Sequence, residues 1–199
     1  MRLLDLNKLA IVIVVALLTL SLAACAQEAT PPPPPPAPPG GTLEIQPAKV
    51  EHETLVQLRP LVAKALKLPD AAAPTLPPYL SMLALPVKFS GAGWPANEMV
   101  FIDLVIPADV EMKGLDRERG EDSVGIAVAT ASPDGSFEAI METTAKLNWI
   151  LRTDWLPEVK PDIASIKPLP NGTYTIRATG IDPRTVATAT WELQLVAPQ

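Results

Sequence analysis

Apolar and polar residues alternate in the second half of the chain. Val100, Ile102 and Leu104 are separated by Phe101 and Asp103, which is the period of two expected of a strand with one buried face. The alternation recurs in further segments, namely 83–90, 123–130, 136–141, 174–179 and 187–196. Short strands separated by turns, without a regular exchange of strand and helix, predict a mainly β fold: an antiparallel β-sandwich.

Glycine and proline mark the turns between these segments. Ser132-Pro133-Asp134-Gly135 has Pro and Gly at the second and fourth positions of a β-turn. This turn predicts a hairpin that joins residues 123–130 to residues 136–141. Residues 91–98 form a second turn signal, which Trp94 is expected to pin because it is the one large aromatic residue there.

Two segments have a helical period instead. Residues 51–68 predict an amphipathic helix, and Pro60 is expected to break it or to begin a second helix, because proline lacks an amide donor and clashes with the preceding turn. Residues 143–155 predict a helical or irregular insertion. The apolar faces of the two segments are Leu55, Leu58, Leu61, Val62, Ala65 and Leu66 in the first, and Leu147, Ile150, Leu151 and Trp155 in the second.

The N-terminus has the pattern of a signal peptide. Arg2 and Lys8 accompany an apolar run over residues 9–22, which is shorter than the roughly 20 residues that a transmembrane helix needs. The run ends in Leu22-Ala23-Ala24-Cys25, which resembles the lipobox of bacterial lipoproteins. The resemblance implies that Cys25, the only cysteine, is lipidated and becomes the first residue. The alternative is an inert cysteine in an ordinary signal peptide or an uncleaved N-terminal helix.

A proline run follows the candidate anchor. Residues 31–39 contain eight prolines and are expected to adopt polyproline II, a stiff spacer of about 3.1 Å per residue. The alternative is a proline motif for a partner's groove. The predicted organisation is therefore a signal peptide at 1–24, lipidated cysteine and tether at 25–41, a helical or linker segment at 42–79 and the β-sandwich at 80–199, with an insertion at about 143–168.

Three motifs resemble those of bacterial immunoglobulin-like surface domains. They are the turn over residues 91–98, the Asp134-Gly135-Ser136-Phe137 motif and residues 169–180, which begin Leu-Pro-Asn-Gly-Thr-Tyr. The resemblance covers roughly residues 80–197 and implies an immunoglobulin-like sandwich. Tyr174 can then place its ring in the core and its hydroxyl on a backbone carbonyl, as in a tyrosine corner.

Charge and cysteine content narrow the function classes. The formal charge of the chain is −6, and loss of Arg2, Lys8 and Asp5 with the signal peptide leaves 14 basic and 21 acidic residues, or −7. Phosphate backbones repel such a domain, so no nucleic-acid partner is expected. If Cys25 carries lipid, no cysteine is left for a disulfide, a thiolate nucleophile or a zinc site. No cofactor is expected beyond the covalent lipid.

Two groups of residues are candidates for ligand contact. An acidic loop between two strands could supply the six to eight oxygens that Ca2+ takes, although Lys113, Arg117 and Arg119 would neutralise much of its charge and favour a solvated loop. Trp149 and Trp155 could stack on sugar rings or contact a protein, or pack the insertion onto the sandwich. The acidic residues are Asp109, Glu111, Asp116, Glu118, Glu121 and Asp122.

No catalytic set stands out, and His52, the only histidine, has no second metal ligand beside it. We therefore expect a non-catalytic, lipid-anchored, extracytoplasmic protein of the bacterial cell envelope. Its immunoglobulin-like domain would serve adhesion, envelope organisation or protein–protein interaction, with the membrane and another envelope protein or a polysaccharide as partners. The alternative is a surface module that binds a glycan or Ca2+.

Overall fold

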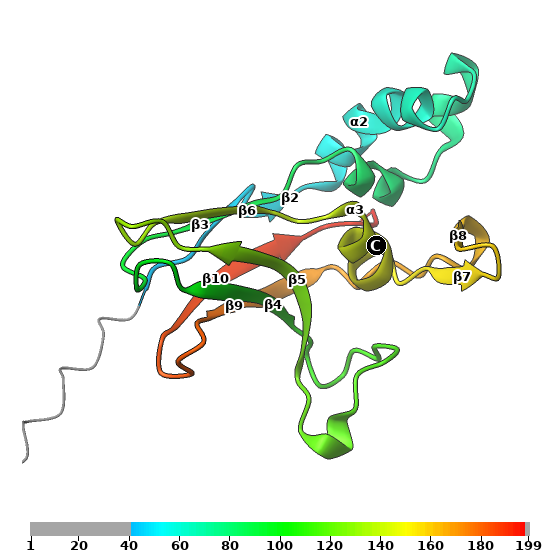
Figure 1. Ribbon diagram of the computed structural model, residues 1–199. Coiled ribbons are helices and arrows are strands. Elements are labelled where there is room, and N and C mark those ends of the chain that lie inside the picture. The colour runs from blue at the N-terminus through cyan, green and yellow to red at the C-terminus, as the bar shows by residue number, and fades with distance from the viewer. Residues whose placement is uncertain (1–40, 198–199) are drawn as a thin grey trace, which may run out of the picture. The chain divides into compact units, whose positions relative to one another are not determined.

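The computed structural model describes residues 41–197, which belong to one compact unit. The expected signal peptide, Cys25 and the proline tether lie outside the described residues. The fold is mainly β, as predicted (Figure 1). Within the described range, no helix combines the length and the hydrophobicity that crossing a bilayer requires.

Two sheets contain the long strands. The first has three antiparallel strands in the order β1 (Glu44–Gln46), β3 (Lys88–Gly91) and β6 (Phe137–Ile140). The second has five, in the order β2 (Lys49–Val50), β10 (Val186–Leu193), β9 (Gly172–Thr179), β4 (Met99–Val105) and β5 (Ser123–Thr130). Only the pairing of β2 with β10 is parallel.

The core lies between the two sheets. Alternate residues point inward along β4, β9 and most of β10, and the fully buried Phe89, Ile102, Ile176 and Trp191 belong to one continuous apolar cluster. Between β1 and β2 the chain passes from one sheet to the other, and the indole Nε1 of Trp191 donates a hydrogen bond of 3.1 Å to the carbonyl of Pro47 at that point. The first strand region therefore contributes to both sheets.

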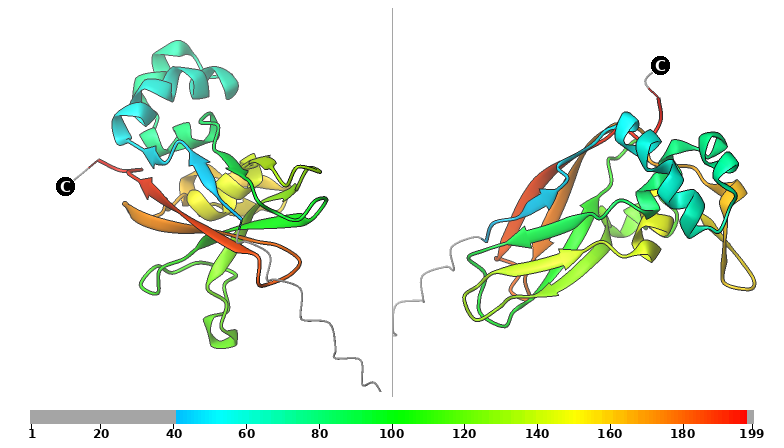
Figure 2. Two further views of the ribbon diagram at one scale, coloured as in Figure 1. Left: turned by 90° about the vertical axis from the view of Figure 1, so that its left-hand side faces the viewer. Right: turned by 90° about the horizontal axis from the view of Figure 1, so that it is seen from above.

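Short helices and a small hairpin complete the fold. Helix α2 (His52–Ala65) and the 3-10 helices η1 (Asp70–Thr75) and η2 (Pro78–Leu83) form a helical arm, seen beyond one end of the sheets in Figure 2. The insertion begins with α3 (Thr143–Ala145) and the π-helical turn η4 (Lys146–Ile150). It continues with the hairpin of β7 (Asp154–Leu156) and β8 (Lys160–Asp162) and with η5 (Ile163–Ser165); η3 (Arg117–Arg119) lies in the acidic loop.

The strand pairings show at which end of the sheets each connection between strands lies. Thr42, before β1, bonds to Ala92, after β3, and the short connections 92–98, 131–136 and 180–185 lie at this same end, the proximal end. The long connections 51–87, 106–122 and 141–171 lie at the other, distal end. The additions to the sheets are therefore gathered at the end away from Thr42 (Figure 1).

Trp94 organises the proximal end. Its indole Nε1 donates to the carbonyl of Thr42 at 3.0 Å, its backbone amide donates to the carbonyl of Gly135, and its ring meets Phe137 edge to face at 5.6 Å between centroids. Gly135 has a φ of +79°, and a Cβ there would lie 2.5 Å from the carbonyl oxygen of Trp94. The prediction that Trp94 pins its turn is confirmed.

The predicted hairpin is wrong, although its turn forms. The amide of Gly135 donates to the carbonyl of Ser132 at 2.9 Å, but β5 pairs with β4 and β6 pairs with β3, so this turn carries the chain from one sheet to the other. The β5 strand has the predicted bounds. Alternation tells which side chains face the core, and it does not tell which strand lies alongside.

The N-terminal part of the unit also differs from expectation. Strands β1 and β2 belong to the two sheets, so the two-sheet unit begins well before residue 80, inside the segment expected to be helix and linker. The strand expected from residue 83 begins only at Lys88, and the part of the expected helical or linker segment that follows α2 contains η1 and the start of η2.

Helix α2 runs through Pro60 without a break. The carbonyl that loses its donor there belongs to Val56, on the exposed side of the helix. In the insertion the helix ends at Ile150, with the wide turn closed by the amide of Leu151 donating to the carbonyl of Lys146 at 2.8 Å. Trp155 consequently lies in β7 and not on the expected helical face.

Tyr174 adopts the predicted arrangement. Its side chain is only 2% exposed, and its hydroxyl donates a hydrogen bond of 2.7 Å to the carbonyl of Pro170. Burial raises the pKa of Tyr174 to about 12. The bond ties the start of β9 to the connection that precedes it.

We expect the substitution Tyr174→Phe to lower the free energy of unfolding by about 1 kcal/mol, because it removes this bond and leaves the ring in place. Urea unfolding measures the change. Tyr79→Phe is the matched control, since the partly buried Tyr79 packs against the core from η2 and its hydroxyl makes no hydrogen bond within residues 41–197. An equal effect of the two substitutions would contradict the role assigned to Tyr174.

Candidate functional site

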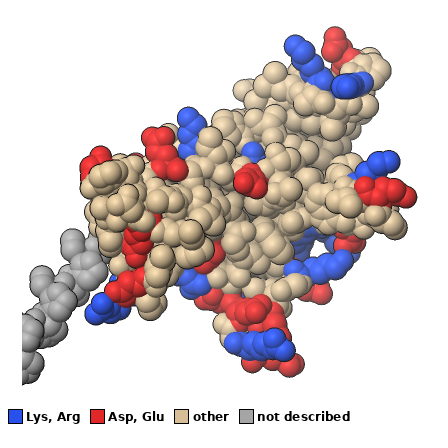
Figure 3. Space-filling model, viewed as in Figure 1, with Lys and Arg blue, Asp and Glu red and all other residues tan. Residues whose placement is uncertain are grey.

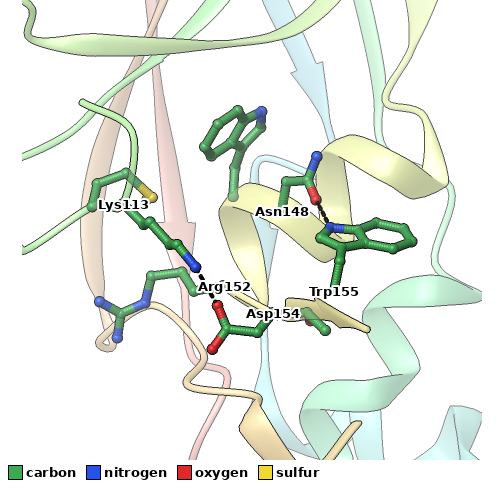
Figure 4. A pocket seen from close by; sticks show the side chains of 8 residues that line it. Lys113, Asn148, Arg152, Asp154 and Trp155 are labelled. Atoms are coloured by element: carbon green, nitrogen blue, oxygen red, sulfur yellow. Dashed lines mark hydrogen bonds and ion pairs between the residues drawn. The ribbon is translucent and has the colours of Figure 1, made fainter. Parts of the chain in front are cut away.

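A pocket of about 370 Å³ lies at the distal end, between the insertion and the loop 106–122 (Figure 4). Met112 and Lys113 line it from the loop, Asn148 and Trp149 from η4, and residues 152–155 from the segment that leads into β7. The two tryptophans singled out in the sequence therefore line one pocket, and its volume lies at the lower end of the range for small-molecule sites.

The two tryptophans differ in exposure. Trp149 is partly buried and packs against the core, whereas Trp155 is 40% exposed. The indole Nε1 of Trp155 donates a hydrogen bond of 2.7 Å to Oδ1 of Asn148, which fixes the orientation of its ring (Figure 4). Within residues 41–197 the aromatic ring pair is Trp94 with Phe137, so the indoles of Trp149 and Trp155 do not fill the pocket by stacking on each other.

Arg152 joins the segments that surround the pocket. Its Nε donates to the carbonyl of Lys167 at 2.7 Å, Nη1 to that of Glu111 at 2.8 Å and Nη2 to that of Pro168 at 3.1 Å. These carbonyls belong to the acidic loop and to the connection before β9. Arg152 thereby fastens three segments to one another, and no sequence signal marked it for this role.

Lys146 fastens the insertion to the first sheet. Its side chain is buried, and Nζ donates to the carbonyl of Leu85, in the link that leads into β3. Burial lowers the pKa of the Lys146 amine. Together with the buried Ile150 and Leu151, this bond fastens η4, which carries Asn148 and Trp149, to the sandwich core.

The rim of the pocket carries a charged pair and an unused hydroxyl. Nζ of Lys113 lies 2.7 Å from Oδ1 of Asp154 (Figure 4), and this hydrogen bond lowers the pKa of Asp154. Because both side chains are exposed, the pair contributes little to stability. Thr153 is only 7% exposed, and its hydroxyl has no hydrogen-bond partner in the described part of the protein.

Three of the six carboxylates in the acidic loop, those of Asp116, Glu121 and Asp122, bond within the protein. Asp116 accepts hydrogen bonds from the amides of Glu118 and Arg119, which caps η3, and Glu121 accepts from the amide of Asp116. Nη2 of Arg117 lies 2.7–3.2 Å from the carbonyls of Ile106, Pro107 and Val110. An arginine of the chain thus occupies the centre of this carbonyl cluster.

Asp122 forms an ion pair with a strand of the five-stranded sheet. It forms a bidentate pair with Arg177 of β9, with distances of 3.0 and 2.8 Å, and the hydrogen bond from Arg177 lowers the pKa of Asp122. Asp109 and Glu111 lie in the same loop, apart from these contacts. Among residues 41–197, no group of three or more acidic, histidine or cysteine side chains is arranged to hold a metal ion.

Charge is dispersed over the surface as well. On the face drawn in Figure 3, Lys and Arg lie among Asp and Glu, and neither sign forms a continuous field.

Comparison with protein-family models, with curated proteins and with solved structures gives no match for this chain. The site therefore has to be interpreted from its own geometry.

We expect Arg152→Ala to lower the free energy of unfolding by about 2 kcal/mol, because three backbone carbonyls lose a charged donor. Amide hydrogen exchange should quicken in β7 and β8 and not in β4. Arg152→Lys should not restore stability, since an ammonium cannot bridge the three carbonyls.

The matched control is Arg119→Ala, which removes an exposed pair with Asp116 and should cost less than about 0.5 kcal/mol. If Arg152→Ala were equally mild, Arg152 would not be the tie that holds the pocket.

Proposed function

We propose that this chain is a non-catalytic, lipid-anchored protein of the bacterial cell envelope. In this proposal Cys25 carries the lipid, residues 25–41 are the tether, and an immunoglobulin-like domain presents an interaction surface to another envelope component. The domain serves adhesion, envelope organisation or protein–protein interaction.

The strand order supports the immunoglobulin-like assignment. In variable-type immunoglobulin domains an extra strand extends the sheet built from the last two strands and the third. Here β5 extends the sheet of β10, β9 and β4 in that manner, and the first strand region is divided between both sheets. The bond from Tyr174 to Pro170 has the form of a tyrosine corner and sits at the start of β9.

The observation that carries the proposal is the separation of the two ends. The segment that would carry the anchor joins the domain at Thr42, at the proximal end, while the helical arm, the acidic loop and the insertion lie at the distal end. An anchored protein with this arrangement holds its elaborated end away from the membrane. The proximal end, with its short turns, offers little besides the attachment.

The helical arm adds an exposed apolar surface to the distal end. Leu61 is 57% exposed, and Leu66 and Leu68 are also exposed near the end of α2. Lys64 and Lys67 lie between them in the sequence. Exposed leucines gathered on one segment are typical of protein contact sites, which supports another envelope protein as a partner.

A second candidate function is ligand binding. The pocket that brings Trp149 and Trp155 together favours it for a small organic ligand. The acidic loop does not add support for Ca2+, because Asp116, Glu121 and Asp122 already bond within the protein.

We expect radiolabelled palmitate to be incorporated into the protein in bacterial cells, and incorporation to be lost in Cys25→Ala together with retention in the membrane fraction. Both results are expected because the lipid is joined to the Cys25 sulfur through a thioether, and because two or more acyl chains give stable anchoring. Ala26→Ser, beside the cysteine, should keep the label. Label that persists in Cys25→Ala would refute the anchor.

A further inference from the structure

The pocket lined by Trp149 and Trp155 has the chemistry of a sugar site. We propose that it binds a neutral pyranose unit of the glucose or N-acetylglucosamine type, within a polysaccharide chain. This inference rests on the proposed function only in one respect, namely that a cell envelope supplies such polysaccharides. The binding itself depends on the pocket.

The indoles supply the stacking surfaces. A pyranose with equatorial substituents has a face made of C–H groups, and such a face packs on an aromatic ring. Trp155 is exposed and its ring is held by the bond to Asn148, so little side-chain freedom remains to be lost on binding. Trp149 is seated against the core and gives the pocket a rigid second wall.

Polar groups are placed for the hydroxyls of the sugar. Asn148 uses Oδ1 for Trp155, which leaves its Nδ2 hydrogens as donors. Asp154 uses Oδ1 for Lys113, which leaves Oδ2 as an acceptor. The hydroxyl of Thr153 is buried beside the pocket and is not one of these groups. A planar amide and a carboxylate beside two indoles match the donors and acceptors of a sugar ring.

The charges favour a neutral sugar. Arg152 directs its nitrogens to three backbone carbonyls, and Lys113 pairs with Asp154. The cations of the pocket are thus engaged within the protein. The chain is acidic overall, which opposes the approach of phosphate- or uronate-rich polymers.

The test uses the full-length protein in a detergent without a sugar head group and isothermal titration calorimetry with two probes, triacetylchitotriose and cellotriose. We expect at least one of them to bind. Trp155→Ala should weaken that binding about tenfold or more, because the stacking surface is lost. Trp155→Phe should retain most of it, and Asn148→Ala should weaken it by removing both a donor and the support of the Trp155 ring.

Ile140→Ala is the control, since Ile140 is exposed on β6 away from the pocket residues and its loss should leave affinity unchanged. Circular dichroism checks that each variant is folded. The inference is overturned if neither probe binds, or if a folded Trp155→Ala binds as tightly as the parent protein. The inference would also be overturned if a partner protein, and neither sugar, bound to the pocket in a way that requires Trp155.

The sugar-binding proposal and the lipidation proposal can be rejected independently of each other. Cys25→Ala should bind the probes as the parent protein does, because the pocket is at the distal end. Palmitate label without sugar binding would reject only the sugar site, and sugar binding without label would reject only the anchor.

Discussion

Trp94 holds together the end of the domain at which the described chain begins. It bonds to Thr42, packs against Phe137 and shares a close backbone contact with Gly135, so the first residues before β1 are fixed to the short turns of both sheets. The long connections 51–87, 106–122 and 141–171 all fall at the opposite end. The position of Thr42 therefore determines which part of the surface an N-terminal anchor would hold outward.

The distal end is built as one assembly and not as separate loops. Arg152 joins the insertion to the acidic loop and to the connection before β9, Lys146 joins it to the link before β3, and Asp122 joins the loop to β9. Each tie pairs a long basic side chain with backbone carbonyls or a carboxylate. Arg152 lines the pocket, and the other ties hold the segments that carry it, which gives the pocket the rigid support that a binding site on loops otherwise lacks.

The sequence predicts the local features of this structure better than their assembly. Alternation identifies the buried positions of β4, and the motif around Tyr174 predicts its hydroxyl bond, because these depend on neighbours within a few residues. In β5 alternation fails after Ile126, because the register with β4 shifts there and leaves Val128 58% exposed and Ala129 buried. The hairpin fails because pairing of β6 with β3 is decided by core packing over a long separation. The expected break at Pro60 is wrong because the free-energy cost of a proline inside a helix depends on whether the carbonyl that loses its donor, here that of Val56, faces water. Arg152 is missed because its three partners lie 15 to 41 residues away.

The central claim is that the pocket and the helical arm face away from the membrane. Energy transfer from a fluorophore to acceptors on lipid headgroups tests it, with the lipidated protein in vesicles and one new cysteine as the labelling site, either Ala96→Cys at the proximal end or Lys64→Cys in α2. The account predicts stronger transfer from position 96 than from position 64. Equal transfer, or stronger transfer from position 64, would contradict it.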